Sequence, residues 1–275
     1  MDAQSMSDHW GSGDIFALIL EAMEAAGLAP DTMTVARMAP VDHFHARGFP
    51  ATVELADALP ILPGHHLVDI GCGLGGPARY LAERFGCRVS GIDITGPFVE
   101  AANKLTAFLG LEGQVDVQLG DGHHLPFGDA AFDGGYTQHV TMNVADRAQF
   151  YGEAFRVLKP GAFFALTEHG LGPQGDPHFP TPWSEDGSGS FLVTPADTVA
   201  HLQAAGFVEI TVEDTGAKYA SGYRRVLELA AQGALPPFSS QILLGATALD
   251  KTLNSARNIE ERRTHPVQII CHKPE

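Results

Sequence analysis

The run Val68-Asp69-Ile70-Gly71-Cys72-Gly73-Leu74-Gly75-Gly76 decides the fold class of this chain. It follows a short apolar segment at 67–70 and precedes a helical pattern at 77–85, so it is a glycine-rich turn between a strand and a helix. Glycines lack a Cβ atom and let the backbone approach a ligand, and the helix that follows offers free N–H groups in its first turn. The run predicts a doubly wound α/β domain, in which such turns lie at the ligand-binding edge of the sheet.

Short apolar runs alternate with helical segments beyond this turn, which is typical of βαβ units that build a mostly parallel sheet. Strands are predicted at 67–70, 88–92, 115–119, 132–137, 162–167, 208–212 and 267–271. Helices are predicted at 14–27, 51–59, 77–85, 97–109, 147–158 and 195–205. Lys159-Pro160-Gly161 is predicted to be a turn before the fifth strand.

The domain organisation follows from the same pattern. Residues 1–62 are predicted to form a helical cap, and residues 63–275 the α/β domain. Within that domain, 170–195 is rich in Gly, Pro, Ser and Asp and is predicted to be a functional loop, while 220–263 is predicted to be a mostly helical insert. We expect the cap and the 170–195 loop to form a lid that excludes water from a site.

Composition excludes several function classes. The formal net charge of −16 repels nucleic acid and anionic membrane surfaces, so neither is expected as a partner. The three cysteines are too few and too dispersed for a disulfide framework, which favours a cytoplasmic location. Residues 1–13 lack a basic export signal, and no segment has the roughly 20 apolar residues of a spanning helix. A homo-oligomer is compatible with these features.

The glycine turn leaves three alternatives open: a dinucleotide site, a site for S-adenosylmethionine (SAM), or a tight strand-to-helix turn without a ligand. Three acidic residues narrow this choice. Asp69 precedes the first glycine by two residues and suits an ammonium or sulfonium better than a pyrophosphate. Asp93 ends the second strand, where a carboxylate can accept both ribose hydroxyls, in SAM as in NAD. Asp121 follows the third strand and could accept the adenine amino group. Each acid taken singly could instead cap a turn.

These motifs resemble the class I SAM-dependent methyltransferase family. The resemblance extends through Ala131-Phe132-Asp133 and Arg156-Val157-Leu158-Lys159-Pro160-Gly161, and it spans roughly residues 67–212. It implies a seven-stranded sheet whose last strand is antiparallel, with SAM as cofactor and S-adenosylhomocysteine as product. The implied cofactor-binding residues are Asp69 and Gln138 at the methionine end, Gly71 and Gly73 in the turn, Asp93 and Ile94 at the ribose, and Asp121, Gly122 and His123 near the adenine.

A narrower resemblance to sarcosine/dimethylglycine-type small-molecule N-methyltransferases rests on the cap, the 137–143 segment, the proline and tryptophan loop, and Phe44-His45 with Gly48. Phe49 stands where a second glycine often accompanies Gly48, and this departure puts an amine substrate in doubt.

Two histidines are the candidate catalytic residues. His139 and His169 are predicted at the carboxyl ends of the fourth and fifth strands, where an imidazole can take a proton from an acceptor near neutral pH. Each could instead have only a structural role, because positioning alone can suffice for methyl transfer from a sulfonium. No metal site is expected, because the pairs His43/His45 and His123/His124 lack a third ligand nearby in sequence.

The sequence thus predicts a methyltransferase that uses SAM to methylate a nitrogen or an oxygen of a small-molecule acceptor. Two alternatives remain open: a non-methylating reaction such as a cyclisation in the same pocket, and SAM binding without chemistry. An NAD-dependent oxidoreductase is the second choice for the cofactor.

Overall fold

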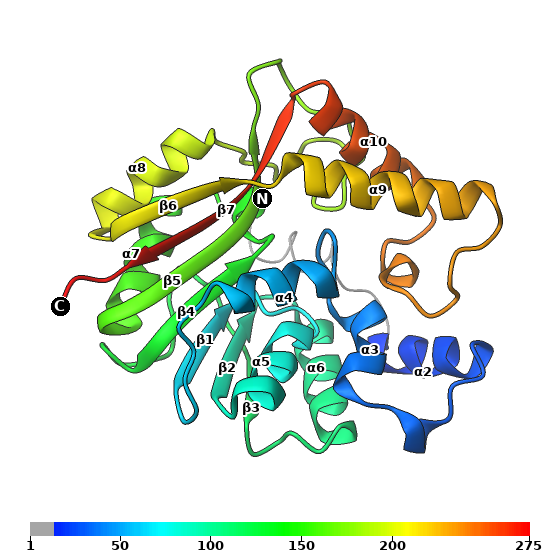
Figure 1. The fold of residues 1–275 in the computed structure, drawn as a ribbon, viewed down its shortest axis with the longest axis horizontal. Coiled ribbons are helices and arrows are strands. Elements are labelled where there is room, and N and C mark those ends of the chain that lie inside the picture. Colours follow the sequence, from blue (N-terminus) through cyan, green and yellow to red (C-terminus); the bar gives the residue numbers. More distant parts are fainter. Residues whose placement is uncertain (1–13) are drawn as a thin grey trace.

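The computed structural model describes residues 14–275, and the predictions made for residues 1–13 lie outside this range. A seven-stranded sheet with the order β3-β2-β1-β4-β5-β7-β6 forms its centre (Figure 1). All neighbouring strands are parallel except β7, which runs antiparallel to both β5 and β6. The strands are β1 (His66–Ile70), β2 (Arg88–Asp93), β3 (Val115–Leu119), β4 (Phe132–Gln138), β5 (Leu158–Leu171), β6 (Val208–Asp214) and β7 (Thr264–His272). The predicted fold class, including the antiparallel last strand, is confirmed.

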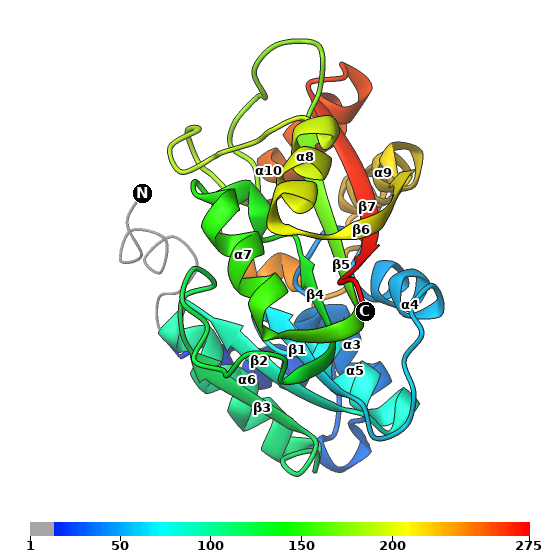
Figure 2. The same ribbon diagram turned by 90° about the vertical axis from the view of Figure 1, so that its left-hand side faces the viewer.

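Helices cover both faces of the sheet, with α7 and α8 on one face and α4 and α5 on the other (Figure 2). Because side chains alternate along a strand, Leu67 packs into the α4 and α5 layer while Val68 packs into the α7 and α8 layer. The helices of these layers are α4 (Phe49–Asp57), α5 (Gly76–Phe85), α6 (Gly96–Phe108), α7 (Arg147–Val157) and α8 (Pro195–Ala205).

The predicted cap contains α2 (Ile15–Ala25) and α3 (Val35–Asp42) ahead of α4. Asp14 caps α2, since its carboxylate accepts a hydrogen bond of 3.0 Å from the Ala17 amide. Buried residues of α2 and α3 form a common core with Phe98 and Leu105 of α6. The cap therefore has no separate core among the described residues, and the boundary at residue 62 remains a prediction.

Two parts of the sequence prediction were wrong. Helix α3 has no counterpart among the predicted helices, and it forms although Pro40, which disfavours a helix interior, stands inside it. Lys159-Pro160-Gly161 was predicted as a turn before the fifth strand but lies within β5. Leu158 pairs with Phe132 and Phe163 pairs with Gly134, so β5 has more residues than β4 between these two pairs, and they form a bulge.

The 220–263 segment consists mainly of helices, as predicted. Helices α9 (Gly216–Ala231) and α10 (Ala248–Glu260) lie side by side at the end of the molecule opposite β3, with the short 3₁₀ helix η3 (Ser240–Leu243) between them in sequence (Figure 1). None of the helices between residues 14 and 275 is long and apolar enough to cross a membrane.

Candidate active site

The glycine-rich turn connects β1 to α5 and forms the floor of a first cavity. Gly71 and Gly73 have φ values of +80° and +52°, in the left-handed region that other residues adopt at a cost. A Cβ atom on Gly71 would lie 2.2 Å from Val140 Cγ2, so the close approach of Val140 leaves space only for glycine at this position. The amide of Gly73 donates a hydrogen bond of 2.8 Å to Asp93 Oδ2, which ties the turn to the end of β2.

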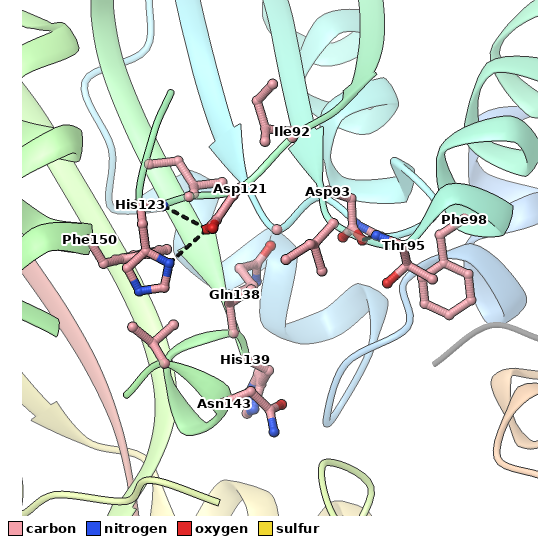
Figure 3. A pocket seen from close by; sticks show the side chains of 18 of the residues that line it. Ile92, Asp93, Thr95, Phe98, Asp121, His123, Gln138, His139, Asn143 and Phe150 are labelled. Carbon is pink, nitrogen blue, oxygen red and sulfur yellow. Dashed lines mark hydrogen bonds and ion pairs between the residues drawn. The ribbon is translucent and has the colours of Figure 1, made fainter. Parts of the chain in front are cut away.

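The first cavity has a volume of about 310 Å³ and lies at the carboxyl ends of β1, β2 and β4 (Figure 3). Eight of the nine predicted cofactor residues line it: Gly71, Gly73, Asp93, Ile94, Asp121, Gly122, His123 and Gln138. Aromatic and polar residues that were not among the predicted cofactor residues also line it: Phe44, Thr95, Phe98, Asn143 and Phe150. The motifs that are separate in sequence therefore converge on one site.

The carboxylate of Asp93 is held in place by backbone donors. Its Oδ1 accepts from the Thr95 amide at 2.9 Å, and its Oδ2 accepts from Gly73. Burial raises the pKa of Asp93, although these hydrogen bonds act in the opposite direction. Each oxygen keeps a second lone pair, so the group can still accept hydrogen bonds from a ligand.

Asp121 and His123 form a pair on the opposite wall (Figure 3). Asp121 Oδ1 accepts from the His123 amide at 2.9 Å and lies 2.7 Å from His123 Nδ1. Partial burial raises the pKa of Asp121, but the hydrogen bonds from His123 outweigh it and leave this pKa below its ordinary value.

Asp69 is the predicted residue that does not line the cavity. It is buried on β1, and its Oδ2 has no hydrogen-bond partner among the described residues. Burial raises its pKa to about 8, an effect that the neighbouring Tyr136 hydroxyl reduces. Gln138, at the end of the adjacent strand, has a buried Nε2 atom that also lacks a partner in the described chain. An acceptor and a donor are thus left unsatisfied at neighbouring strand ends.

A second cavity of about 510 Å³ adjoins the first, and both are lined by Phe44 and His139. Its walls come from α3, the 43–50 segment, α9 and the predicted functional loop, which contributes Pro182 and Trp183. The loop is held against α10 by Asn258, which accepts from the His178 amide at 2.7 Å and donates to the His178 carbonyl at 3.0 Å. These contacts make the loop a wall of the second cavity.

His139 lies where the two cavities meet. Its backbone has a φ of +58°, and its amide donates to the Thr167 carbonyl at 2.8 Å, which fixes the position of the ring at the end of β4. Its Nε2 lies 2.8 Å from the Tyr219 hydroxyl, and its ring is stacked on His45 with centroids 5.8 Å apart. Burial, followed by the nearby His169, His45 and Arg47, lowers the pKa of His139 well below its ordinary value, so this imidazole is neutral at pH 7.

His169 lies in the second cavity and not in the first. It is buried inside β5, with its ring stacked on Trp183 at 5.0 Å and its Nε2 3.1 Å from the Tyr223 hydroxyl. Burial lowers its pKa to about 3. Of the two candidate histidines, the structure brings only His139 to the junction.

Residues 68–166, which contain the glycine turn and the first cavity's acids, match the family model described as a methyltransferase domain. This segment is a methyltransferase domain. The match begins within β1 and ends within β5, so it covers the strands that position the first cavity.

Curated relatives of the methyltransferase domain are themselves named methyltransferases. Methyltransferase phqN of Penicillium fellutanum is 34% identical over 170 residues, which are 60% of this chain and 52% of the relative. The 24-methylenesterol C-methyltransferase 2 of Oryza sativa subsp. japonica is 41% identical over 115 residues, or 42% of this chain and 32% of the relative. The chain thus spans about half or less of the length of these relatives.

Solved structures share the fold at low sequence identity. A Haemonchus contortus phosphoethanolamine N-methyltransferase 2 superposes with a TM-score of 0.77 at 19% identity, over 100% of this chain and 61% of that one. The geranyl diphosphate C-methyltransferase of Streptomyces coelicolor A3(2) gives 0.72 at 19% identity, over 98% and 97% of the two chains. A putative sarcosine dimethylglycine methyltransferase of Galdieria sulphuraria gives 0.66 at 17% identity, over 82% and 83%.

Several residues that contact the candidate histidines lie outside the motifs that the sequence analysis identified. Tyr219 and Tyr223 contact the two histidines but lie on α9, about 80 residues beyond His139 in the case of Tyr219. His45 and Thr52 come from the cap, where the His45 Nε2 lies 3.0 Å from Thr52 Oγ1. The sequence contains no spacing signal for these contacts, because they join elements that meet only in the folded chain.

Proposed function

We propose that this chain is a SAM-dependent methyltransferase that binds SAM in the first cavity and methylates a small molecule held in the second. The observation that carries the proposal is the junction of the two cavities at His139, beside a cavity lined by Asp93 and Asp121. A donor in one cavity and an acceptor in the other would meet at this residue, as alignment for an in-line displacement requires.

The residues of the first cavity fit SAM. Asp93 offers carboxylate oxygens to the ribose hydroxyls, and Asp121 offers an acceptor to the adenine amino group. Gln138 lines the cavity, and its unpartnered Nε2 offers a donor to the carboxylate of the methionine end. Asp69 does not line the cavity, and we propose that it acts on the methionine end from behind the cavity wall, where its Oδ2 is also unpartnered. A buried pair of this kind is costly unless a ligand satisfies it.

Bound SAM would supply a methyl group already activated by a sulfonium. The contribution of the protein is then to exclude water, orient the acceptor and receive its proton. We assign the last role to His139: its Nε2–H donates to the Tyr219 hydroxyl, and its Nδ1, which makes no hydrogen bond within the described residues, accepts the proton. The proton arrives as the adjacent sulfonium charge is lost, so the site holds one positive charge before and after transfer. His169 lines the acceptor cavity and is proposed to orient the acceptor.

The methylated atom is proposed to be oxygen or nitrogen, although the sterol relative is named a C-methyltransferase, so carbon belongs among the tested acceptors. The cytoplasmic location also remains a proposal, which the three buried free thiols Cys72, Cys87 and Cys271 support.

Calorimetric titration with SAM, S-adenosylhomocysteine and NAD tests the cofactor, and release of S-adenosylhomocysteine in the presence of amines, phenols, carboxylates and alkenes tests the reaction. We expect micromolar binding of S-adenosylhomocysteine, no binding of NAD, and turnover with at least one acceptor. Acceptor conversion without S-adenosylhomocysteine release would identify the cyclisation alternative, and SAM binding without any conversion would favour a binding protein. An Asp93→Ala variant is the control, because it removes the ribose acceptor.

A further inference from the structure

The second cavity differs in charge from the rest of the molecule. The chain has a formal net charge of −16, yet none of the described residues that line this cavity is Asp or Glu. Its ionisable lining consists of His43, His45, His139, His169, Tyr223, Arg47 and Arg225. A positively charged acceptor would find no carboxylate there to replace its lost hydration.

Three of the four histidines of this lining, His45, His139 and His169, do not supply positive charge either. Burial lowers the pKa of His45 and of His169 to about 3, and it holds the pKa of His139 well below its ordinary value. At pH 7 these three imidazoles are neutral and can act as hydrogen-bond acceptors as well as donors.

The two arginines are occupied or lie at the rim. Arg47 makes two hydrogen bonds to Glu54, at 3.0 Å and 2.5 Å, so its charge is compensated. Its guanidinium lies 5.5 Å from the centre of the Tyr219 ring. The side chain of Arg225 is 64% exposed and lies 3.5 Å from Glu228, so water screens its charge. Neither arginine of the lining therefore offers a phosphorylated acceptor a free buried cation.

The remaining lining is largely apolar, with side chains such as Ala39, Met142, Val226 and Leu244. The volume of about 510 Å³ lies within the range of pockets that hold drug-sized ligands. One face of Trp183 is already covered by His169, which reduces the aromatic surface available for cation–π contact.

We propose that the second cavity binds an uncharged, mainly apolar acceptor of drug-like size with a hydroxyl group that donates a hydrogen bond to His139. The proposal rests on the proposed function and names its substrate class. It disfavours both an ammonium acceptor, as the narrower family resemblance suggested, and a phosphorylated one. At pH 7.4 only about one molecule in a thousand of a primary amine with an ordinary pKa near 10.4 is neutral, so such an acceptor would enter the cavity as an ammonium.

The test uses three probes that share one apolar body: 2-naphthylmethanol, 2-naphthylmethylamine and 2-naphthylmethyl phosphate. Their affinities for the full chain are measured at pH 7.4 by calorimetry with saturating S-adenosylhomocysteine. We expect the alcohol to bind about tenfold or more tightly than the ammonium and the phosphate ester. Equal or tighter binding of either charged probe overturns the proposal, and so does failure of the alcohol to bind at millimolar concentration.

A matched pair of variants shows that the probes occupy this cavity. Val226 lies on α9 and lines it, and Val226→Asp and Val226→Asn are nearly equal in size and differ in charge. Val226→Asp is expected to narrow the preference for the alcohol over the ammonium by about tenfold, and Val226→Asn is expected to leave the preference unchanged. Equal effects of the two variants would contradict the assignment of the probes to the second cavity. If the wild-type chain did not bind S-adenosylhomocysteine, the proposed function itself would be refuted. Failure of the proposed function is thus distinguishable from failure of the proposed acceptor class.

Discussion

Replacement of Gly73 by alanine separates the fold of the glycine turn from its ligand-binding role. Gly73 has a φ of +52°, and no atom lies within 4 Å of a Cβ built on it, so the added methyl group would stand in the open space of the first cavity. An alanine in the left-handed region costs about 1–2 kcal/mol, and its lower entropy in the unfolded state offsets about 0.4–1 kcal/mol of this. The net loss of about 1 kcal/mol corresponds to a decrease in Tm of about 2–4 °C.

The effect on ligand binding should be larger. The Gly73 amide is bonded to Asp93 Oδ2, so the turn cannot retreat from a ligand without losing that hydrogen bond. An extra methyl group in a packed site costs about 1–3 kcal/mol, which weakens the affinity for S-adenosylhomocysteine about 5- to 150-fold.

Gly64 provides the control for this experiment. It has a φ of +82°, no atom within 4 Å of a built Cβ, and a position outside both cavities. Gly64→Ala should therefore lower Tm by a similar amount and leave the affinity unchanged. Calorimetric titration with S-adenosylhomocysteine and thermal unfolding without ligand measure the two effects. Affinities of both variants within about twofold of the wild type would refute the assignment of the first cavity to the cofactor.

Three further predictions concern buried polar groups. The pKa of Asp69 is about 8 in the folded state and about 3.8 ordinarily, so between these pH values the folded state keeps a proton that the unfolded state releases. The free energy of unfolding therefore falls as the pH rises from about 4 to about 8. Asp69→Asn should raise Tm at pH 7.5 without ligand, with a smaller gain at pH 5. His139→Asn should lower kcat about 10²- to 10⁴-fold, a larger change than in its affinity for S-adenosylhomocysteine, and Tyr219→Phe should have a smaller effect on kcat; an unaltered kcat in His139→Asn would exclude the base role. The buried Arg79 donates to Asp42 at 2.8 Å and to acceptors on the glycine turn and α6. Arg79→Lys should therefore lower the free energy of unfolding, measured by urea titration, by about 3–5 kcal/mol, and a loss below about 1 kcal/mol would contradict this.

Local errors in the sequence prediction have identifiable physical causes. Pro40 disfavours a helix by local propensity, but the burial of Met38 and Val41 against α6 and η3 stabilises α3 in spite of it. The Lys-Pro-Gly segment was read as a turn because these residues favour turns, but pairing with β4 extends β5 through them as a bulge. In both cases tertiary contacts outweighed local propensity.

The sequence by itself determined the parallel sheet, the glycine turn and the line of acids at its carboxyl edge. These features depend on short-range patterns: a period of two along each strand, glycines at fixed positions in the turn, and acids directly after consecutive strands. Eight of the nine predicted cofactor residues consequently line one cavity.

Only the tertiary structure decided the acceptor side. His45 from the cap, His139 after β4, His169 in β5 and Tyr219 on α9 are far apart in sequence and meet because their helices and strands pack around one space. Their burial in that space makes the imidazoles neutral, and no sequence motif encodes burial. Whether the second cavity suits a charged or an uncharged acceptor thus depends on how the chain packs. The residues that line the first cavity, in contrast, are already encoded in the order of strands, glycines and acids.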